Sequence, residues 1–181
     1  MKTFCTVSDY NYLNQGLVLY ESLVKHCPLE FKLYYLCIDK KAYDKLVELN
    51  LDHIIPQWTG YIPTLTNSTN IGYAGYCWSL GCRYTQYICD TFKPEEIMYI
   101  DSDIVFYPGI KNIYEEIGTR SIAIIPHLHI SVGSGPGGYN VGIVYFKNNK
   151  PGKICLDFWV DCVMGKRPEH KNPNKIGRAH V

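Results

Sequence analysis

Two aspartates, Asp101 and Asp103, stand two positions apart in the apolar run Glu96–Phe106. In an extended strand, alternate side chains point to one face, so the two Cα atoms would lie ~6.5 Å apart. One divalent cation can bridge both carboxylates at that spacing. Burying two like charges in an apolar segment is costly unless a positive charge compensates them. The pair therefore predicts a site for Mn²⁺ or Mg²⁺, and the alternative interpretation is two solvated acids in a turn after a strand.

The chemistry expected at such a pair is that of a diphosphate. A hard cation held by one or two carboxylates completes its shell with water and substrate phosphates. There it stabilises the charge that develops on a departing diphosphate. Ligands of open α/β sheets bind beyond the carboxyl ends of the strands, and both aspartates follow the β-prone residues Ile97–Ile100 directly.

The elements that must position this pair alternate between strand and helix patterns. Strand patterns occupy 2–7, 31–38, 53–55, 96–106, 121–125 and 141–146. Helical spacing of apolar residues occupies 14–27, 43–47, 76–90, 110–117 and 154–163. This alternation predicts an α/β fold with a mostly parallel central sheet flanked by helices on both faces. We expect 57–72 to form a surface loop and Gly133–Gly138 a flexible lid.

Composition restricts the class of protein. The chain has 181 residues, 46% of them hydrophobic, and a net charge of +1, which suits a globular domain and excludes a nucleic-acid footprint. It has no signal-peptide pattern and no apolar run of about 18 residues, so we expect no transmembrane segment. Eight cysteines without C-x-x-C spacing predict reduced thiols rather than disulfides or zinc, and hence a cytoplasmic protein.

The last six residues, 176–181, read like a translated sequencing adapter. We therefore expect the native domain to occupy 1–175 and to be incomplete at its C-terminus. A genuine polar tail is the alternative.

Four stretches follow one another in a fixed order. They read Phe-Cys-Thr-Val-Ser-Asp at 4–9 with Gly-Leu-Val-Leu-Tyr-Glu-Ser-Leu at 16–23, Tyr-Cys-Trp-Ser-Leu at 76–80, Tyr-Ile-Asp-Ser-Asp-Ile-Val at 99–105, and Tyr-Asn-Val-Gly-Ile-Val-Tyr-Phe-Lys-Asn at 139–148. Over about residues 1–163, the chain thus resembles the GT-A fold glycosyltransferases. The resemblance is strongest to the family-8-like group that includes glycogenin and lipopolysaccharide galactosyltransferases.

The resemblance implies a metal-dependent glycosyltransferase that moves a sugar from a nucleotide-diphosphate donor, with a UDP-sugar favoured, to an acceptor hydroxyl with retention. The acceptor class stays open between a glycan, a lipid-linked sugar and a protein. The implied catalytic residues are Asp101, Asp103 and Asn140, and the first two are also the implied metal ligands. The implied nucleotide contacts are Thr6, Val7, Ser8, Tyr12, Trp78, Asp101, Ser102 and Asp103, and the implied donor-sugar contacts are Asn140 and Gly142.

Several of these residues also have a structural interpretation. Thr6 and Val7 suit a strand core, Tyr12 a surface aromatic, and Gly142 a place where only a small residue packs. Trp78 stands where several family members carry an arginine, so Arg83 is a candidate for contacts with the diphosphate, or else extends to solvent. The family's third metal ligand, a histidine, has no counterpart. His127 and His129 suit a loop, with His127 kept as a candidate sugar or acceptor contact.

Two further functions compete with glycosyl transfer. Haloacid-dehalogenase phosphatases also use two aspartates after a strand, which would make Asp101 the nucleophile and Asp103 the acid/base. That class expects its motif near the N-terminus and a further acidic pair downstream, where this chain offers only Asp157 and Asp161 on a predicted helix. A fragment that binds nucleotide without transfer activity is the third interpretation.

Overall fold

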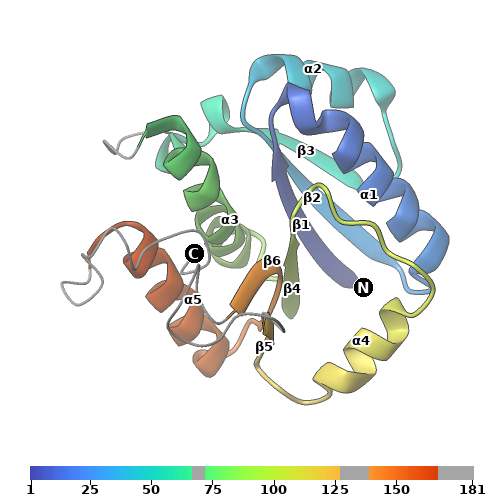
Figure 1. Cartoon of the computed structure of the whole chain (residues 1–181), viewed down its shortest axis with the longest axis vertical. Coiled ribbons are helices and arrows are strands. Elements are labelled where there is room, and N and C mark those ends of the chain that lie inside the picture. The colour runs from blue at the N-terminus through green and yellow to red at the C-terminus, as the bar shows by residue number, and fades with distance from the viewer. Residues whose placement is uncertain (67–71, 127–138, 167–181) are drawn as a thin grey trace.

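The structure, a computed structural model, describes residues 1–66, 72–126 and 139–166. A six-stranded sheet with helices on both faces forms its centre (Figure 1). Its strand order is β3-β2-β1-β4-β6-β5. The strands are β1 (Lys2–Ser8), β2 (Phe31–Cys37), β3 (Ile54–Trp58), β4 (Glu96–Ile100), β5 (Ile122–Pro126) and β6 (Tyr139–Lys147). The first four run parallel, whereas β6 is antiparallel to both β4 and β5, so the predicted mostly parallel sheet is confirmed with one reversed strand.

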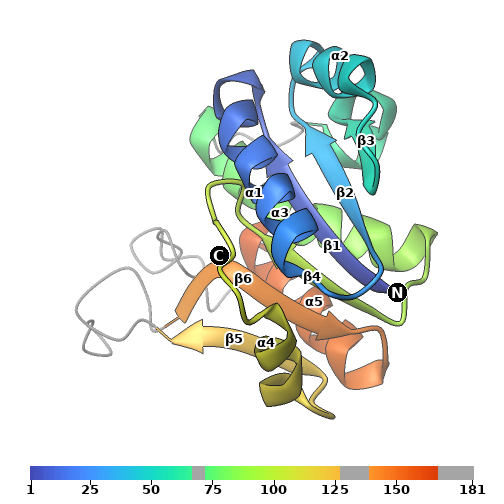
Figure 2. The same cartoon turned by 90° about the vertical axis from the view of Figure 1, so that its right-hand side faces the viewer.

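The helices form two groups. On one face lie α1 (Leu13–His26), α2 (Lys40–Leu49) and α4 (Ile110–Ile117), and on the other lie α3 (Gly72–Thr91) and α5 (Lys150–Val163). Figure 2 shows α1 in front of the sheet with α3 and α5 behind it. Strand β4 serves both faces because its side chains alternate: Met98 and Ile100 pack under the first group, and Ile97 and Tyr99 under the second. Burial on both faces explains the continuous apolar pattern of this strand.

Side-chain caps fix where helices α2 and α5 begin. Asp39 accepts a hydrogen bond from the backbone N–H of Ala42 at 2.9 Å and begins α2, while Asn149 accepts one from Gly152 at 3.1 Å and begins α5. Asp39 also accepts the N–H of Tyr10, the first residue of the short 3₁₀ helix η1 (Tyr10–Tyr12), at 2.7 Å. The turn after β1 and the turn after β2 are therefore joined.

Two expectations from the sequence are wrong. The strand expected over 96–106 ends at Ile100, and Asp101–Asp103 form a turn closed by the Ile104 N–H on the Asp101 carbonyl at 3.2 Å. The same-face geometry of an extended strand therefore does not apply to the two aspartates. The surface loop expected over 57–72 contains the end of β3 and two 3₁₀ helices, η2 (Thr59–Tyr61) and η3 (Pro63–Leu65).

The segment 57–66 also reaches the core, since Ile62 and Leu65 are buried. Other expectations fall on residues outside the described ranges: the lid at Gly133–Gly138, His127, His129 and the tail 176–181. No disulfide joins the eight cysteines, all of which are described. Within the described ranges, no helix is long and apolar enough to span a membrane.

Candidate active site

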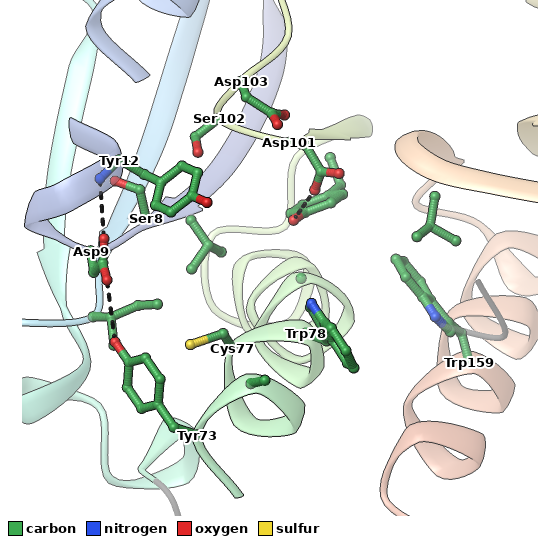
Figure 3. Close-up of a pocket in the computed structure, with 16 residues that line it drawn as sticks. Ser8, Asp9, Tyr12, Tyr73, Cys77, Trp78, Asp101, Ser102, Asp103 and Trp159 are labelled. Atoms are coloured by element: carbon green, nitrogen blue, oxygen red, sulfur yellow. Dashed lines mark hydrogen bonds between the residues drawn. The ribbon is translucent and has the colours of Figure 1, made fainter. Parts of the chain in front are cut away.

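A pocket of about 460 Å³ lies at the carboxyl ends of β1 and β4, where the sheet meets α3 and α5 (Figure 3). It brings together residues from segments far apart in the sequence. The predicted nucleotide contacts that line it are Val7, Ser8, Tyr12, Trp78, Asp101, Ser102 and Asp103. In Figure 3, Ser8, Asp9 and Tyr12 form one side of the pocket and Trp159 the opposite side.

The side formed by β1 is held by hydrogen bonds. Asp9 accepts the backbone N–H of Tyr12 at 3.1 Å, and the Tyr73 hydroxyl of α3 donates to its other oxygen at 3.4 Å. The Ser8 hydroxyl lies 2.7 Å from that of the fully buried Tyr35. Tyr35 reaches this position only because residue 16 of α1 is a glycine: an added Cβ would overlap the Tyr35 hydroxyl and lie 2.6 Å from Cζ. Helix α1 and strand β2 thus jointly orient the end of β1.

The aspartate turn is tied to three elements. The Asp101 N–H donates to the Gly142 carbonyl of β6 at 2.8 Å, and the Tyr99 hydroxyl donates to Asp101 Oδ1 at 2.7 Å. Beyond the turn, the Phe106 N–H donates to the buried Ser22 hydroxyl of α1 at 3.0 Å. Asp101 is partly buried, Ser102 is buried and Asp103 is exposed.

Electrostatics at the turn are unfavourable for negative charge. Burial raises the pKa of the Asp101 carboxyl above its ordinary value, the hydrogen bond from Tyr99 opposes this rise, and the charge of Asp103 adds to it. Burial, and then the charge of Asp101, raise the pKa of the Tyr99 hydroxyl, which therefore stays protonated and acts as the donor. Charged groups on the pocket's described lining are all acidic: Asp9, Asp101 and Asp103, with no lysine, arginine or histidine.

Strand β6 places the predicted sugar-side residues Asn140 and Gly142 beside the aspartate turn, although neither lines the pocket. The Gly142 N–H donates to Asn140 Oδ1 at 2.7 Å. A Cβ on Gly142 would lie 2.9 Å from Asn140 Oδ1 and 3.3 Å from Asp101 Oδ2, so the small residue lets both side chains approach the strand. Val141, between the two predicted residues, lines the pocket itself. The structure therefore juxtaposes Asn140, Gly142 and Asp101, which the sequence separates by about forty positions.

Besides Asn140 and Gly142, two more predicted residues do not line the pocket. Thr6 is fully buried with a hydroxyl that has no hydrogen-bond partner, and it does not line the pocket. Arg83 neither faces the pocket nor extends to solvent: it is buried, and its guanidinium donates to the carbonyls of Thr64 at 2.6 Å and Thr66 at 3.3 Å. The expectation that Arg83 extends to solvent is wrong, and a contact with the diphosphate gains no support, because this side chain anchors Thr64 of η3 and the following Thr66 to α3.

Two carboxylates suit a hard cation, since oxygen ligands are those that Mn²⁺ and Mg²⁺ prefer. Within the described ranges, no group of three or more His, Cys, Asp or Glu side chains gathers as a metal site. A cation held by this pair would therefore need further oxygen ligands, such as water, a bound phosphate, or an amide or backbone carbonyl.

Sequence reasoning missed several pocket residues. Tyr73, Cys77 and Gly81 of α3, Tyr99 of β4 and Trp159 of α5 all line the pocket. Tyr99 could have been found, because it precedes Asp101 by two positions, the spacing at which side chains of the expected strand would share a face. Trp159 gave no such signal, since its spacing is that of a core residue of a helix.

The phosphatase interpretation gains no support. Asp157 accepts a hydrogen bond from Gln86 of α3 at 2.7 Å, and Asp161 pairs with Lys166 at 3.5 Å. Neither carboxylate lines the pocket that contains Asp101. The acidic pair that a phosphatase would need beside its nucleophile is therefore absent from the described part of the pocket.

Comparison with known proteins gives no matching family model. The chain is 25% identical over 169 residues to the uncharacterized protein YfnD of Bacillus subtilis (strain 168), covering 88% of this chain and 54% of that protein. It is 24% identical over 190 residues to YfnF of the same organism, covering 96% of this chain and 62% of that protein. The chain thus spans little more than half the length of these relatives.

Solved structures resemble it over most of its length. The apo-form glycosyltransferase GlyE of Streptococcus pneumoniae TIGR4 has a TM-score of 0.57 at 20% identity, covering 94% of this chain and 39% of that one. The galactosyltransferase LgtC in complex with donor and acceptor sugar analogs has a TM-score of 0.61 at 13% identity, covering 96% of this chain and 67% of that one. Mouse xyloside xylosyltransferase 1 has a TM-score of 0.62 at 12% identity, covering 99% of this chain and 77% of that one. The chain has the GT-A fold of these glycosyltransferases.

Proposed function

We propose that the protein is a metal-dependent glycosyltransferase that moves a sugar from a nucleoside diphosphate donor, with a UDP-sugar favoured, to an acceptor hydroxyl. One observation carries the proposal: the turn after β1 and the aspartate turn after β4 line one pocket, and the Asn140–Gly142 segment of β6 lies beside the aspartate turn and lines the pocket through Val141. This is the edge of the sheet where ligands of open α/β folds bind. The fold similarity to glycosyltransferases agrees with it.

The charges of the pocket support a role for Mn²⁺ or Mg²⁺. A nucleoside diphosphate is an anion, and the described lining offers it three carboxylates and no cationic side chain. Like charges at contact distances repel strongly away from bulk water, so the diphosphate needs a compensating cation. Asp101 and Asp103 would hold that cation. When bound, it supplies Lewis-acid stabilisation of the charge on the departing diphosphate.

The remaining residues are proposed to contact different parts of the donor, the nucleoside and the sugar. Ser8, Tyr12 and Tyr73 lie at the end of the pocket suited to the nucleoside, where aromatic rings and hydroxyls can contact a base and a ribose, and Val7 also lines the pocket. Trp78 of α3 is 53% exposed and lies between Cys77 and Trp159 in Figure 3, where its ring offers an apolar surface. Asn140 and Gly142 are assigned to the donor sugar, and retention of anomeric configuration is proposed on the resemblance described above.

Calorimetry tests the proposal. We expect Mn²⁺ to raise the affinity for UDP by about 5- to 150-fold, and UDP to raise the affinity for Mn²⁺ by the same factor, as linkage requires. Asp101→Asn should abolish this coupling. Asp157→Asn is the matched control, because it neutralises a carboxylate on the α3-facing surface of α5 outside the pocket. Binding of UDP that is equal with Mn²⁺ and with chelator would refute the proposal.

Sugar transfer is proposed for the whole protein, since the chain spans only part of its relatives. A panel of UDP-, GDP- and ADP-sugars, assayed by release of the nucleoside diphosphate with Mn²⁺, would identify the donor. NMR of the product anomer would decide between retention and inversion. We expect UDP release and retention.

A further inference from the structure

The ring of Tyr99 is held from both helices that cover its face of the sheet. A Cβ on Gly81 of α3 would lie 2.9 Å from Tyr99 Cζ and 3.1 Å from its hydroxyl oxygen, so glycine is what allows the ring to pass α3 so closely. From α5, the Trp159 ring packs edge-on with 6.3 Å between ring centroids. The residue is 8% exposed. The ring can therefore leave this position only if the Trp159 side chain or α3 moves.

The hydroxyl of this fixed ring reaches the aspartate turn. It donates to Asp101 Oδ1 at 2.7 Å, while Asp101 Oδ2 lies on the Gly142 side, 3.3 Å from where a Cβ on that residue would stand. The backbone of Asp101 is fixed separately by its N–H on the Gly142 carbonyl at 2.8 Å. With the backbone set, the hydrogen bond from Tyr99 is what selects one orientation of the carboxylate.

We propose that Tyr99 is a positioning residue: its buried hydroxyl holds Asp101 Oδ1 and thereby leaves Oδ2 available to a divalent cation. The role of the cation rests on the proposed function, whereas the orientation of the carboxylate does not. Hydrogen-bond donors behind a metal ligand fix its orientation, and their removal costs about 10- to 100-fold in metal affinity. Through Tyr99, the packing of α3 and α5 sets the geometry of the aspartate turn.

The chain contains a matched control. Tyr145 of β6 also donates its hydroxyl to a carboxylate, that of Glu96 of β4, at 2.8 Å. This pair lies at the other end of β4 and does not line the pocket. Tyr145→Phe therefore removes a hydrogen bond of the same kind without touching the aspartate turn.

The experiment compares wild type, Tyr99→Phe and Tyr145→Phe. NMR couplings between Hα and Hβ of Asp101 in the metal-free protein report its side-chain rotamer, and electron paramagnetic resonance of free Mn²⁺ reports the metal affinity. We expect one rotamer in wild type and Tyr145→Phe, and averaged couplings in Tyr99→Phe with Mn²⁺ bound about 10- to 100-fold more weakly. Thermal melting of all three proteins checks that each is folded.

Gly81→Ala gives a second route, because it displaces the ring while keeping the hydroxyl. We expect it to average the Asp101 couplings, and the double variant with Tyr99→Phe to be no worse than either alone in metal affinity. Wild-type couplings in Tyr99→Phe would overturn the inference, as would an equal loss of Mn²⁺ affinity in Tyr145→Phe. If wild type itself binds no Mn²⁺, the metal site of the proposed function fails, and the couplings alone still decide whether Tyr99 positions Asp101.

Discussion

Replacing Gly16 by alanine in α1 should destabilise the protein, although alanine is the better helix former by about 1 kcal/mol. The added Cβ would overlap the Tyr35 hydroxyl and stand 2.6 Å from Cζ and 2.9 Å from Cε2. Tyr35 is fully buried, so its ring can yield only by moving neighbours in the core. Overpacking of this kind costs about 1–3 kcal/mol. The displaced ring also loses its 2.7 Å hydrogen bond with Ser8, worth about 0.5–1.5 kcal/mol.

The unfavourable effects therefore exceed the helix-propensity gain, and we expect a net loss of about 1–3 kcal/mol in the free energy of unfolding. Urea denaturation followed by circular dichroism measures it. Tyr35→Phe removes the overlapping oxygen, so the double variant should be more stable than the sum of the two single changes predicts. A Gly16→Ala protein that is as stable as wild type, or more stable, would refute the reasoning. Additive single changes would show that the two residues are not coupled.

Two other predictions concern charged residues. Because the pKa of Asp101 is raised in the folded state, metal-free wild type should lose stability as pH rises from the ordinary carboxyl value, 3.8, through the raised one. Metal-free Asp101→Asn should lack this loss and melt higher than wild type at pH 7, and equal melting temperatures at pH 7 would contradict the assignment. Arg83→Met should destabilise the protein, because it leaves the carbonyls of Thr64 and Thr66 without a donor, while folded Arg83→Met should bind UDP with Mn²⁺ as wild type does. Weaker UDP binding by a fully folded variant would restore Arg83 as a diphosphate contact.

The sequence predicted most elements because burial leaves a periodic pattern. The helix expected over 110–117 is found at Ile110–Ile117, and the strand expected over 31–38 at Phe31–Cys37. Strand ends were less predictable. Ile104, Val105 and Phe106 are as β-prone as the residues before Asp101, yet the strand ends at Ile100. What ends it is tertiary: Ser22 of α1 accepts the N–H of Phe106 and draws the chain away from the sheet.

The helix before the aspartate strand shows a second limit. Glycine disfavours helical structure, so Gly81 by itself weakens the helix expected over 76–90. Yet α3 is continuous through it, and the glycine is where the Tyr99 ring of β4 packs. The loss of helix stability at Gly81 is a local effect, whereas the reason for a glycine here is the packing of a ring eighteen positions away in sequence. No pattern within the helix could have indicated that contact.

The position of the pocket follows from a feature that no motif encodes, which is the direction of the connections between strands. From β1 the chain passes through α1 to β2 and through α2 to β3 in one direction along the sheet, with both helices on one face. From β3 it returns through α3 on the opposite face to β4, on the other side of β1. The helices thus diverge above β1 and β4, and side chains at the carboxyl ends of these two strands are left uncovered. Ser8 and Asp9 follow one strand and Asp101 follows the other, so the topology alone places them at a common opening. A strand order that placed another strand between β1 and β4 would separate them, even with every motif intact.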